Sequence, residues 1–362
     1  MYRKIIGFLE AWKKSEHRKP LILQGARQVG KTYSILEFGR THYENVVYFN
    51  FETNPKLNET FAENISPDYL IPILSHIAGQ TIVKEKTLVV FDEVQLCERA
   101  LTSLKYFCED APEYHIIVAG SLLGVAVNRA KFSFPVGKVD MKTMYPMDME
   151  EFMLALGAND LVEQIKKCFH TDTPLPSALH DAAMQLYRQY LVVGGMPECV
   201  LQFAETKDYI LVRHTQDTIL ASYLNDMSKY NNLNEIKKTR LAYDNITVQL
   251  SKKNTRFQYK LLKKGGRASE FENAIEWLCL SGIVSQVYKV EQIRKPLENY
   301  RDIDAFKIYV SDLGLLCAKK DLAANDILYM VEEINDFKGG MAENYVNVQL
   351  TINGYRTYYW ES

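Results

Sequence analysis

The segment GARQVGKT, at residues 25–32, constrains the fold of this chain more than any other feature. It satisfies the pattern G-x-x-x-x-G-K-[ST] of a phosphate-binding loop, the P-loop. An apolar run at residues 21–23 precedes it and a helix-compatible stretch at residues 33–38 follows, which is the context that a P-loop requires. The glycines let backbone N–H groups turn inward around phosphate oxygens, and the helix start adds partial positive charge. We therefore expect a nucleotide phosphate site here.

The residue types in this loop predict how it binds ATP and Mg²⁺. The Lys31 ammonium would neutralise the β and γ oxygens, and the Thr32 hydroxyl would bind the metal ion. The residues of this segment expected to contact ATP are Gly25, Ala26, Arg27, Gln28, Val29, Gly30, Lys31, Thr32 and Tyr33.

A second apolar run, at residues 88–91, ends in Asp92 and Glu93. A carboxylate at the end of a core strand can hold Mg²⁺ through its water shell, which is the Walker B role that we expect for Asp92. Glu93 is placed to orient an attacking water and to accept its proton. A solvated strand end would explain an Asp-Glu pair standing alone, but the preceding P-loop favours the catalytic interpretation.

Ser121 follows the run at residues 116–119 and is the expected sensor of the γ-phosphate or of the water. The alternative is a simple turn serine, because Gly120-Ser121 is turn chemistry. The residues after Asp92 do not form D-x-x-G, and the chain has no N-K-x-D or T-K-x-D segment. Guanine selectivity is thus unsupported, and ATP is the expected nucleotide.

Short apolar runs alternate with helical stretches from residue 20 to residue 148. The runs lie at residues 21–23, 46–49, 88–91 and 116–119. Such runs are typical of buried parallel strands, so we expect an α/β fold in which helices cover both faces of a parallel sheet. Sites in these sheets form at the carboxyl ends of the strands.

Composition places the chain among ordinary globular proteins of the cytoplasm. It has 362 residues, 47% of them hydrophobic, and a net charge of −2, which gives no general attraction to nucleic acid or membrane. The six cysteines lie far apart and no signal peptide or membrane-spanning run is evident. We expect two or three domains and an amphipathic helix near the N-terminus, with Ile5, Phe8, Leu9 and Trp12 at helical spacing.

Several segments resemble the prokaryotic AAA-type ATPases of the archaeal ATPase group. They are PLILQGARQVGKT (20–32), VYFNFETNP (47–55), FDEVQ (91–95), AGS (119–121), FPVGKVDMKTMYPMDMEEF (134–152) and VGGMPECV (193–200). The resemblance covers the whole chain. It implies a P-loop domain at residues 1–148, a helical lid at 149–232, a winged-helix-like domain at 233–300 and a partial α/β module at 301–362.

The same resemblance suggests further residues of the nucleotide site. In these relatives a Gly-x-Pro turn of the lid lies near the nucleotide, and Gly195-Met196-Pro197 matches it, so Pro197 is a candidate for adenine contact. A plain turn between helices is the alternative. Arg129 is a candidate arginine finger, whereas Lys138 stands where relatives often have Gly-Arg and offers only a point charge. A neighbouring subunit could supply the missing arginine, so an oligomer is possible.

Residues 237–267 contain ten basic residues and one acid, Asp244. Because the stretch falls in the winged-helix-like region, it could lie against DNA phosphates. A solvated face or a docking surface for an acidic protein are the alternatives, since Glu270, Glu272 and Glu276 follow on the expected recognition helix. The overall function is then ATP hydrolysis that moves a lid and winged helix, or a nucleotide-switched DNA- or protein-binding regulator with little turnover.

In these relatives the last module resembles the PD-(D/E)xK nucleases. Its first acid would correspond to Glu343, but the metal-binding Asp and the E-x-K segment would follow Ser362, where this sequence stops. We therefore expect a truncated tail without nuclease activity, an incomplete sheet, and a surface position for Glu343, because one carboxylate cannot hold a catalytic metal.

Overall fold

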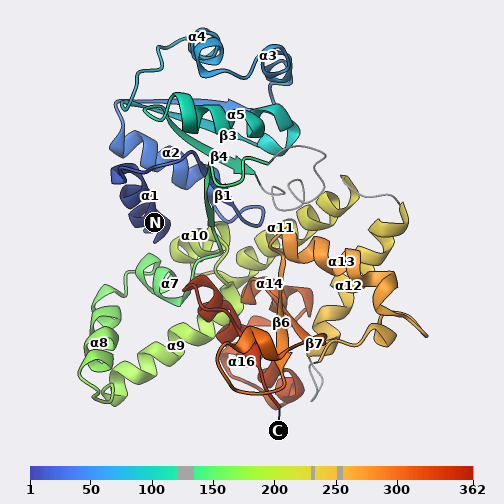
Figure 1. The fold of residues 1–362 in the computed structure, drawn as a ribbon. Helices are drawn as coiled ribbons and strands as arrows, with labels where there is room; N and C mark the ends of the chain where they lie inside the picture. Colours follow the sequence, from blue (N-terminus) through green and yellow to red (C-terminus); the bar gives the residue numbers. More distant parts are fainter. Residues whose placement is uncertain (121–133, 230–232, 251–255, 362) are drawn as a thin grey trace. The chain divides into compact units, whose positions relative to one another are not determined.

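The structure is a computed structural model that describes residues 1–120, 134–229, 233–250 and 256–361 (Figure 1). It divides into two compact units. The first is Arg3–Met144, and the second consists of Met1–Tyr2 with Tyr145–Ser362. The division expected from the sequence, with boundaries at residues 148, 232 and 300, stays a prediction.

The first unit contains a five-stranded parallel sheet in the order β2-β3-β4-β1-β5. Its strands are β1 (Leu21–Gln24), β2 (Asn45–Asn50), β3 (Thr87–Asp92), β4 (His115–Gly120) and β5 (Asp140–Thr143). The first four confirm the strands that the apolar runs predict. Strand β5 was not predicted from the sequence, because its four residues are mostly polar and it pairs only along one edge.

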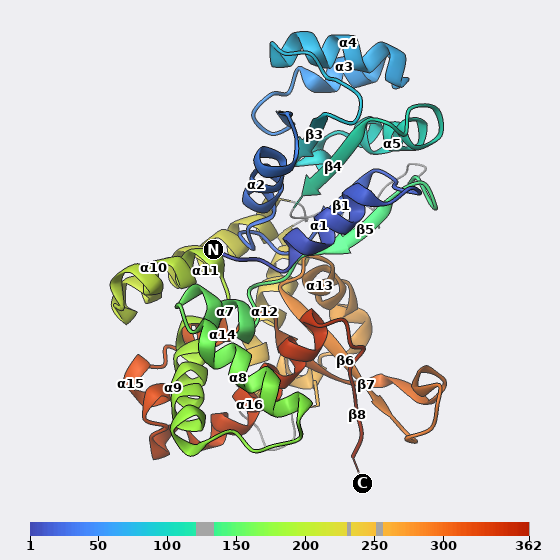
Figure 2. The ribbon, with the colours of Figure 1, turned by 90° about the vertical axis from the view of Figure 1, so that its left-hand side faces the viewer.

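Helices cover both faces of this sheet, as predicted (Figures 1 and 2). The helices of the first unit are α1 (Ile5–Lys14), α2 (Lys31–His42), α3 (Leu57–Glu63), α4 (Pro67–Ala78) and α5 (Glu98–Asp110). Val47 and Val89 belong to a core that also includes residues of α3, α4 and α5. Successive strand residues point to opposite faces of the sheet. Val46 and Leu88, which precede Val47 and Val89, therefore face the other side of the sheet, where they lie close against Gly39 of α2.

Within its described residues, the second unit has a series of helices before its first strand. They are α7 (Met149–Ala155), α8 (Asn159–His170), α9 (Ser177–Val193), α10 (Pro197–Thr206), α11 (Tyr209–Lys229), α12 (Leu233–Leu250) and α13 (Ala268–Leu280). Further along the chain follow α14 (Leu313–Lys319), α15 (Ala324–Leu328) and α16 (Asn335–Ile352). Helix α14 packs against α9 and α11, so segments far apart in the sequence share this core.

A three-stranded sheet completes the second unit. Strands β6 (Val284–Val290) and β7 (Arg301–Val310) are antiparallel, and β8 (Tyr358–Tyr359) lies parallel to β6 at the other edge (Figure 2). The pairing of β6 with β7 joins residues on both sides of the boundary predicted at residue 300. Every helix in the described part of the chain is too short or too polar to cross a membrane.

Candidate functional site

The P-loop connects β1 to α2, as its pattern predicts. Gly25 has φ +146°, and a Cβ there would lie 2.1 Å from the Met144 carbonyl oxygen. Gly30 has φ +89° and precedes the first residue of α2. Both conformations favour glycine, and the first also leaves no space for a side chain. The glycines of the motif are therefore required by the loop's backbone path.

Lys31 lies inside the loop rather than in solvent. Its Nζ donates hydrogen bonds to the carbonyl oxygens of Gly25 (2.9 Å) and Ala26 (2.8 Å), and the residue is 7% exposed. Burial lowers the pKa of Lys31 to about 8, although the carboxylates of Glu93 and Asp92 act in the opposite direction. The ammonium thus bonds to the loop itself at the position where phosphate oxygens are expected.

The structure brings the P-loop and the end of β3 together. The Thr32 Oγ1 donates to Asp92 Oδ2 at 2.8 Å, across 60 residues of sequence. Both are hard oxygen ligands of the kind that Mg²⁺ prefers, and this ion keeps most of its waters in nucleotide sites, so two protein oxygens suffice. Among the described residues no group of three or more His, Cys, Asp and Glu side chains could hold a metal ion.

Glu93 has a restrained carboxylate. Its backbone is left-handed, with φ +52°, which is uncommon for a residue other than glycine. The Gln95 Nε2 donates a short hydrogen bond to Glu93 Oε2. Burial raises the pKa of Glu93, which makes it a stronger base than an exposed glutamate. The side chain predicted to accept a proton therefore has the electrostatic surroundings of a general base.

Two residues that were not predicted from the sequence, Tyr48 and Asn50, complete this edge of the sheet. The Tyr48 hydroxyl donates to Asp92 Oδ2 at 2.7 Å, and Asn50 Nδ2 donates to the same hydroxyl at 3.2 Å. Burial raises the pKa of Tyr48 to about 12, so it stays a donor at neutral pH. The signal in the sequence was that the polar Asn50 directly follows the apolar run at residues 46–49. The pairing of β2 with β3, which places Asn50 opposite Asp92, came from the structure.

The remaining predicted ATP contacts of the loop differ in exposure. Ala26 and Val29 are buried. Gln28 has φ +65°, and Tyr33 is 61% exposed at the first turn of α2. The positive charge of Arg27 acts to lower the pKa of both Lys31 and Glu93, because it disfavours a second cation and favours an anion.

Two predicted residues, Ser121 and Arg129, lie outside the described residues. Their roles as sensor and arginine finger stay predictions. Lys138 pairs with Glu109 at 2.8 Å on the surface of the first unit.

Pro197 belongs to the second unit, where it starts α10. The turn before it is tightly packed: Gly195 N donates to the buried Asp312 at 2.6 Å, and Met147 N donates to the Gly195 carbonyl at 2.7 Å. A Cβ on Gly195 would lie 2.0 Å from the Met147 carbonyl oxygen. The glycines of this turn thus have a packing role, and contact of Pro197 with adenine stays a prediction.

The basic stretch is partly neutralised within the second unit. Lys238 pairs with Glu235 at 3.0 Å and Lys263 with Glu270 at 2.8 Å, whereas Asp244, the one acid of the stretch, pairs with Lys319 from outside it at 2.7 Å. Lys252 and Lys253 lie outside the described residues. Exposed cations at Lys237, Lys260, Lys264 and Arg267 keep this stretch available to an anionic surface.

Glu343 is half exposed on α16, in agreement with the surface position predicted for it. Its Oε2 lies 3.2 Å from Lys307 Nζ and accepts from the Tyr309 hydroxyl at 3.0 Å. Both partners come from β7, so the carboxylate holds the helix against the sheet.

Two family models match parts of the chain. Residues 17–153 match the family described as an AAA domain, and residues 184–326 match a domain of unknown function, DUF8612. None of the curated proteins matches the sequence.

Solved structures with a similar fold include the Walker-type ATPase PABY2304 of Pyrococcus abyssi. The match has a TM-score of 0.54 at 13% identity and covers 88% of this chain and 95% of that chain. The ORC2 protein of Aeropyrum pernix, in ADPNP and ADP complexes, has 13% identity and a TM-score of 0.40, over 94% of this chain and 95% of that chain.

The AAA match includes all five strands of the first sheet and the P-loop. With the fold similarity to the Pyrococcus abyssi protein, it supports a P-loop NTPase fold for the first unit. A likeness at 13% identity supports the fold alone. The winged helix and the nuclease-like module that the sequence resemblance implies stay predictions.

Proposed function

We propose that this protein binds ATP with Mg²⁺ and hydrolyses it to ADP and phosphate at the carboxyl edge of the sheet in its first unit. The observation that carries the proposal is the 2.8 Å hydrogen bond between Thr32 and Asp92, which joins the P-loop to the acidic end of β3. Lys31 inside the loop and Glu93 beside Asp92 supply the other charges that such a reaction needs.

Each side chain has a distinct role in the proposed reaction. Lys31 would exchange its two carbonyl partners for phosphate oxygens, and Thr32 with Asp92 would hold the metal ion and its waters. When bound, Mg²⁺ neutralises charge on the phosphate oxygens. Glu93 would accept a proton from the water that attacks the γ-phosphorus, while the bond to the β-phosphate oxygen breaks. Its raised pKa suits this task.

ATP binding and hydrolysis would also drive a movement of the second unit. We propose that the helices of the second unit respond to the nucleotide state as a lid, with Pro197 and Ser121 near the nucleotide. Contact of residues 237–267 with DNA or with an acidic protein, a possible oligomer and a cytoplasmic location stay predictions of the same kind.

Two substitutions test the chemistry. Lys31→Ala should weaken ATP binding by roughly a hundredfold or more, because it removes the charge inside the loop. Glu93→Gln should keep ATP affinity and slow turnover by roughly a hundredfold to ten-thousandfold, since an amide cannot accept the proton. Binding is measured by calorimetry and turnover by phosphate release.

Lys105→Ala and Glu98→Gln, both exposed on α5, are the matched controls and should behave like the unmodified protein. Unchanged hydrolysis by the Glu93→Gln variant would rule out the role given to Glu93. Unchanged ATP affinity in the Lys31→Ala variant would rule out the site itself.

A further inference from the structure

Arg3 is a buried arginine whose side chain reaches the P-loop. The residue is 7% exposed, and its Nη1 donates a hydrogen bond to the Val29 carbonyl oxygen at 2.9 Å. The two residues are 26 positions apart in the sequence, and both belong to the first unit. Val29 is one of the variable positions of the motif, so the pattern itself says nothing about a partner for its carbonyl group.

This hydrogen bond holds the orientation of the peptide group between Val29 and Gly30. In a trans peptide, the carbonyl of one residue and the N–H of the next point in opposite directions. With the Val29 carbonyl held towards Arg3, the Gly30 N–H points to the opposite side. Gly30 can adopt many backbone conformations, so this peptide plane is among the easiest in the loop to rotate. The hydrogen bond from Arg3 to the Val29 carbonyl therefore restricts a rotation that the backbone would otherwise allow.

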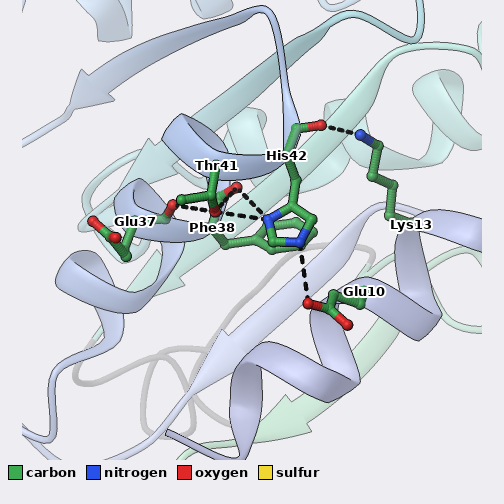
Figure 3. Close-up of polar contacts among 6 residues, drawn as sticks. All are labelled: Glu10, Lys13, Glu37, Phe38, Thr41 and His42. Carbon is green, nitrogen blue, oxygen red and sulfur yellow. Dashed lines mark hydrogen bonds and ion pairs between the residues drawn. The ribbon is translucent and has the colours of Figure 1, made fainter. Parts of the chain in front are cut away.

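Helix α1 holds Arg3 in place. The His42 Nε2 lies 3.1 Å from Glu10 Oε1, and the Lys13 ammonium donates a short hydrogen bond to the His42 carbonyl (Figure 3). These contacts fix the end of α1 to the end of α2, while Arg3, just before α1, contacts the loop from which α2 starts. Ile5, Leu9 and Trp12 bury the side of α1 that faces the core.

We propose that Arg3 is a positioning residue of the phosphate site, which keeps the Gly30 N–H directed at the nucleotide phosphates before ATP arrives. This inference rests on the proposed function, because it assigns a task within the same site. It makes α1 a functional part of the P-loop domain. Such preorganisation favours ATP binding, because the Gly30 N–H does not have to be oriented when the nucleotide binds.

The test compares Arg3→Met, Arg3→Lys and Arg40→Met. Methionine keeps the apolar stem of Arg3 but has no donor, and lysine keeps one donor for the single carbonyl. Arg40 is exposed on α2, with its side chain 4.0 Å from Glu37, and serves as the matched control. ATP and ADP affinities are measured by calorimetry, and kcat and KM by phosphate release.

Arg3→Met should lose roughly tenfold to a hundredfold in affinity for ATP and ADP, with kcat at saturating ATP within about twofold of the unmodified protein. Arg3→Lys should recover most of the affinity, and Arg40→Met should change neither quantity. If Arg3 only stabilised the fold, Arg3→Met would lower kcat and the melting temperature together with the ATP affinity.

Unchanged affinity in Arg3→Met, or equal losses in Arg3→Met and Arg3→Lys with a reduced kcat, would overturn the inference. Failure of the proposed function gives a different result, because the unmodified protein would then not bind ATP.

Discussion

Lys31 shows how the P-loop accommodates a buried cation. Its ammonium donates to two carbonyl groups of its own loop, at 2.9 and 2.8 Å, and gives up most of its contact with water. Carbonyl dipoles compensate the charge less well than a phosphate does. Burial lowers the pKa of Lys31 to about 8, which links nucleotide binding to pH.

ATP binding should weaken as pH rises above about 8. The pKa of Lys31 lies below its usual value, so the loop loses the charged form as pH rises through about 8, whereas bound phosphate favours that form. The dissociation constant of ATP should rise roughly tenfold between pH 7 and pH 9. Calorimetry in buffers of different ionisation enthalpy should show proton uptake at pH 9. In Lys31→Arg, where the charge persists, the same rise would contradict this explanation.

At the scale of elements, the turn between α9 and α10 depends on one buried carboxylate. Asp312 accepts from the Leu315 N–H at 2.8 Å, which caps α14, and from the Gly195 N–H at 2.6 Å. Burial raises the pKa of Asp312 to about 6, although these N–H groups oppose the change. A Cβ on Gly194 would lie 2.2 Å from Asp312 Oδ1. The Gly-Gly sequence thus allows the turn to approach the cap of a distant helix.

Asp312→Ala should lower the free energy of unfolding of the second unit by about 2–4 kcal/mol, because at least two buried N–H groups lose their acceptor. Asp181→Ala, on an exposed aspartate of α9, should change it by less than about 0.5 kcal/mol. Urea unfolding followed by circular dichroism measures both. Equal unfolding midpoints for the two variants would show that the buried carboxylate does not hold this turn.

At the scale of the whole molecule, the chain passes between the two units over a very short segment. Met144 N donates to the Gln24 carbonyl beside the P-loop, at 2.8 Å. Met147 N donates to Gly195 in the second unit, at 2.7 Å. Tyr145 and Pro146 alone separate these two anchored residues. One end of this segment is therefore hydrogen-bonded beside the P-loop and the other end to the Gly195 turn.

Hydrogen exchange should reveal this coupling. Saturating Mg-ATP should slow amide exchange in the P-loop and also change it around the Gly195 turn, because the segment between Met144 and Met147 is anchored at both ends. The same nucleotide should have no effect on the Lys31→Ala variant. Protection confined to the first unit would show that nucleotide state does not reach the second one.

Local patterns predicted a large share of the fold and of the site. Glycine conformations, apolar runs and the strand–loop–helix order are properties of neighbouring residues, so the P-loop, four strands of the sheet and the Asp92–Glu93 end of β3 could be recognised directly. Strand β5 was missed because its short polar segment acquires its structure from pairing with β1.

The sequence by itself determined which groups carry the charge: Lys31 in a glycine-bounded loop, and two adjacent carboxylates after a core strand. Tertiary structure alone decided the distant partners, including Tyr48 and Thr32 on Asp92 and, in the loop itself, Arg3 on the Val29 carbonyl. The physical reason is that φ and ψ preferences act between neighbours in the chain. A buried hydrogen bond forms wherever the folded backbone brings a donor to an acceptor, whatever their separation in sequence.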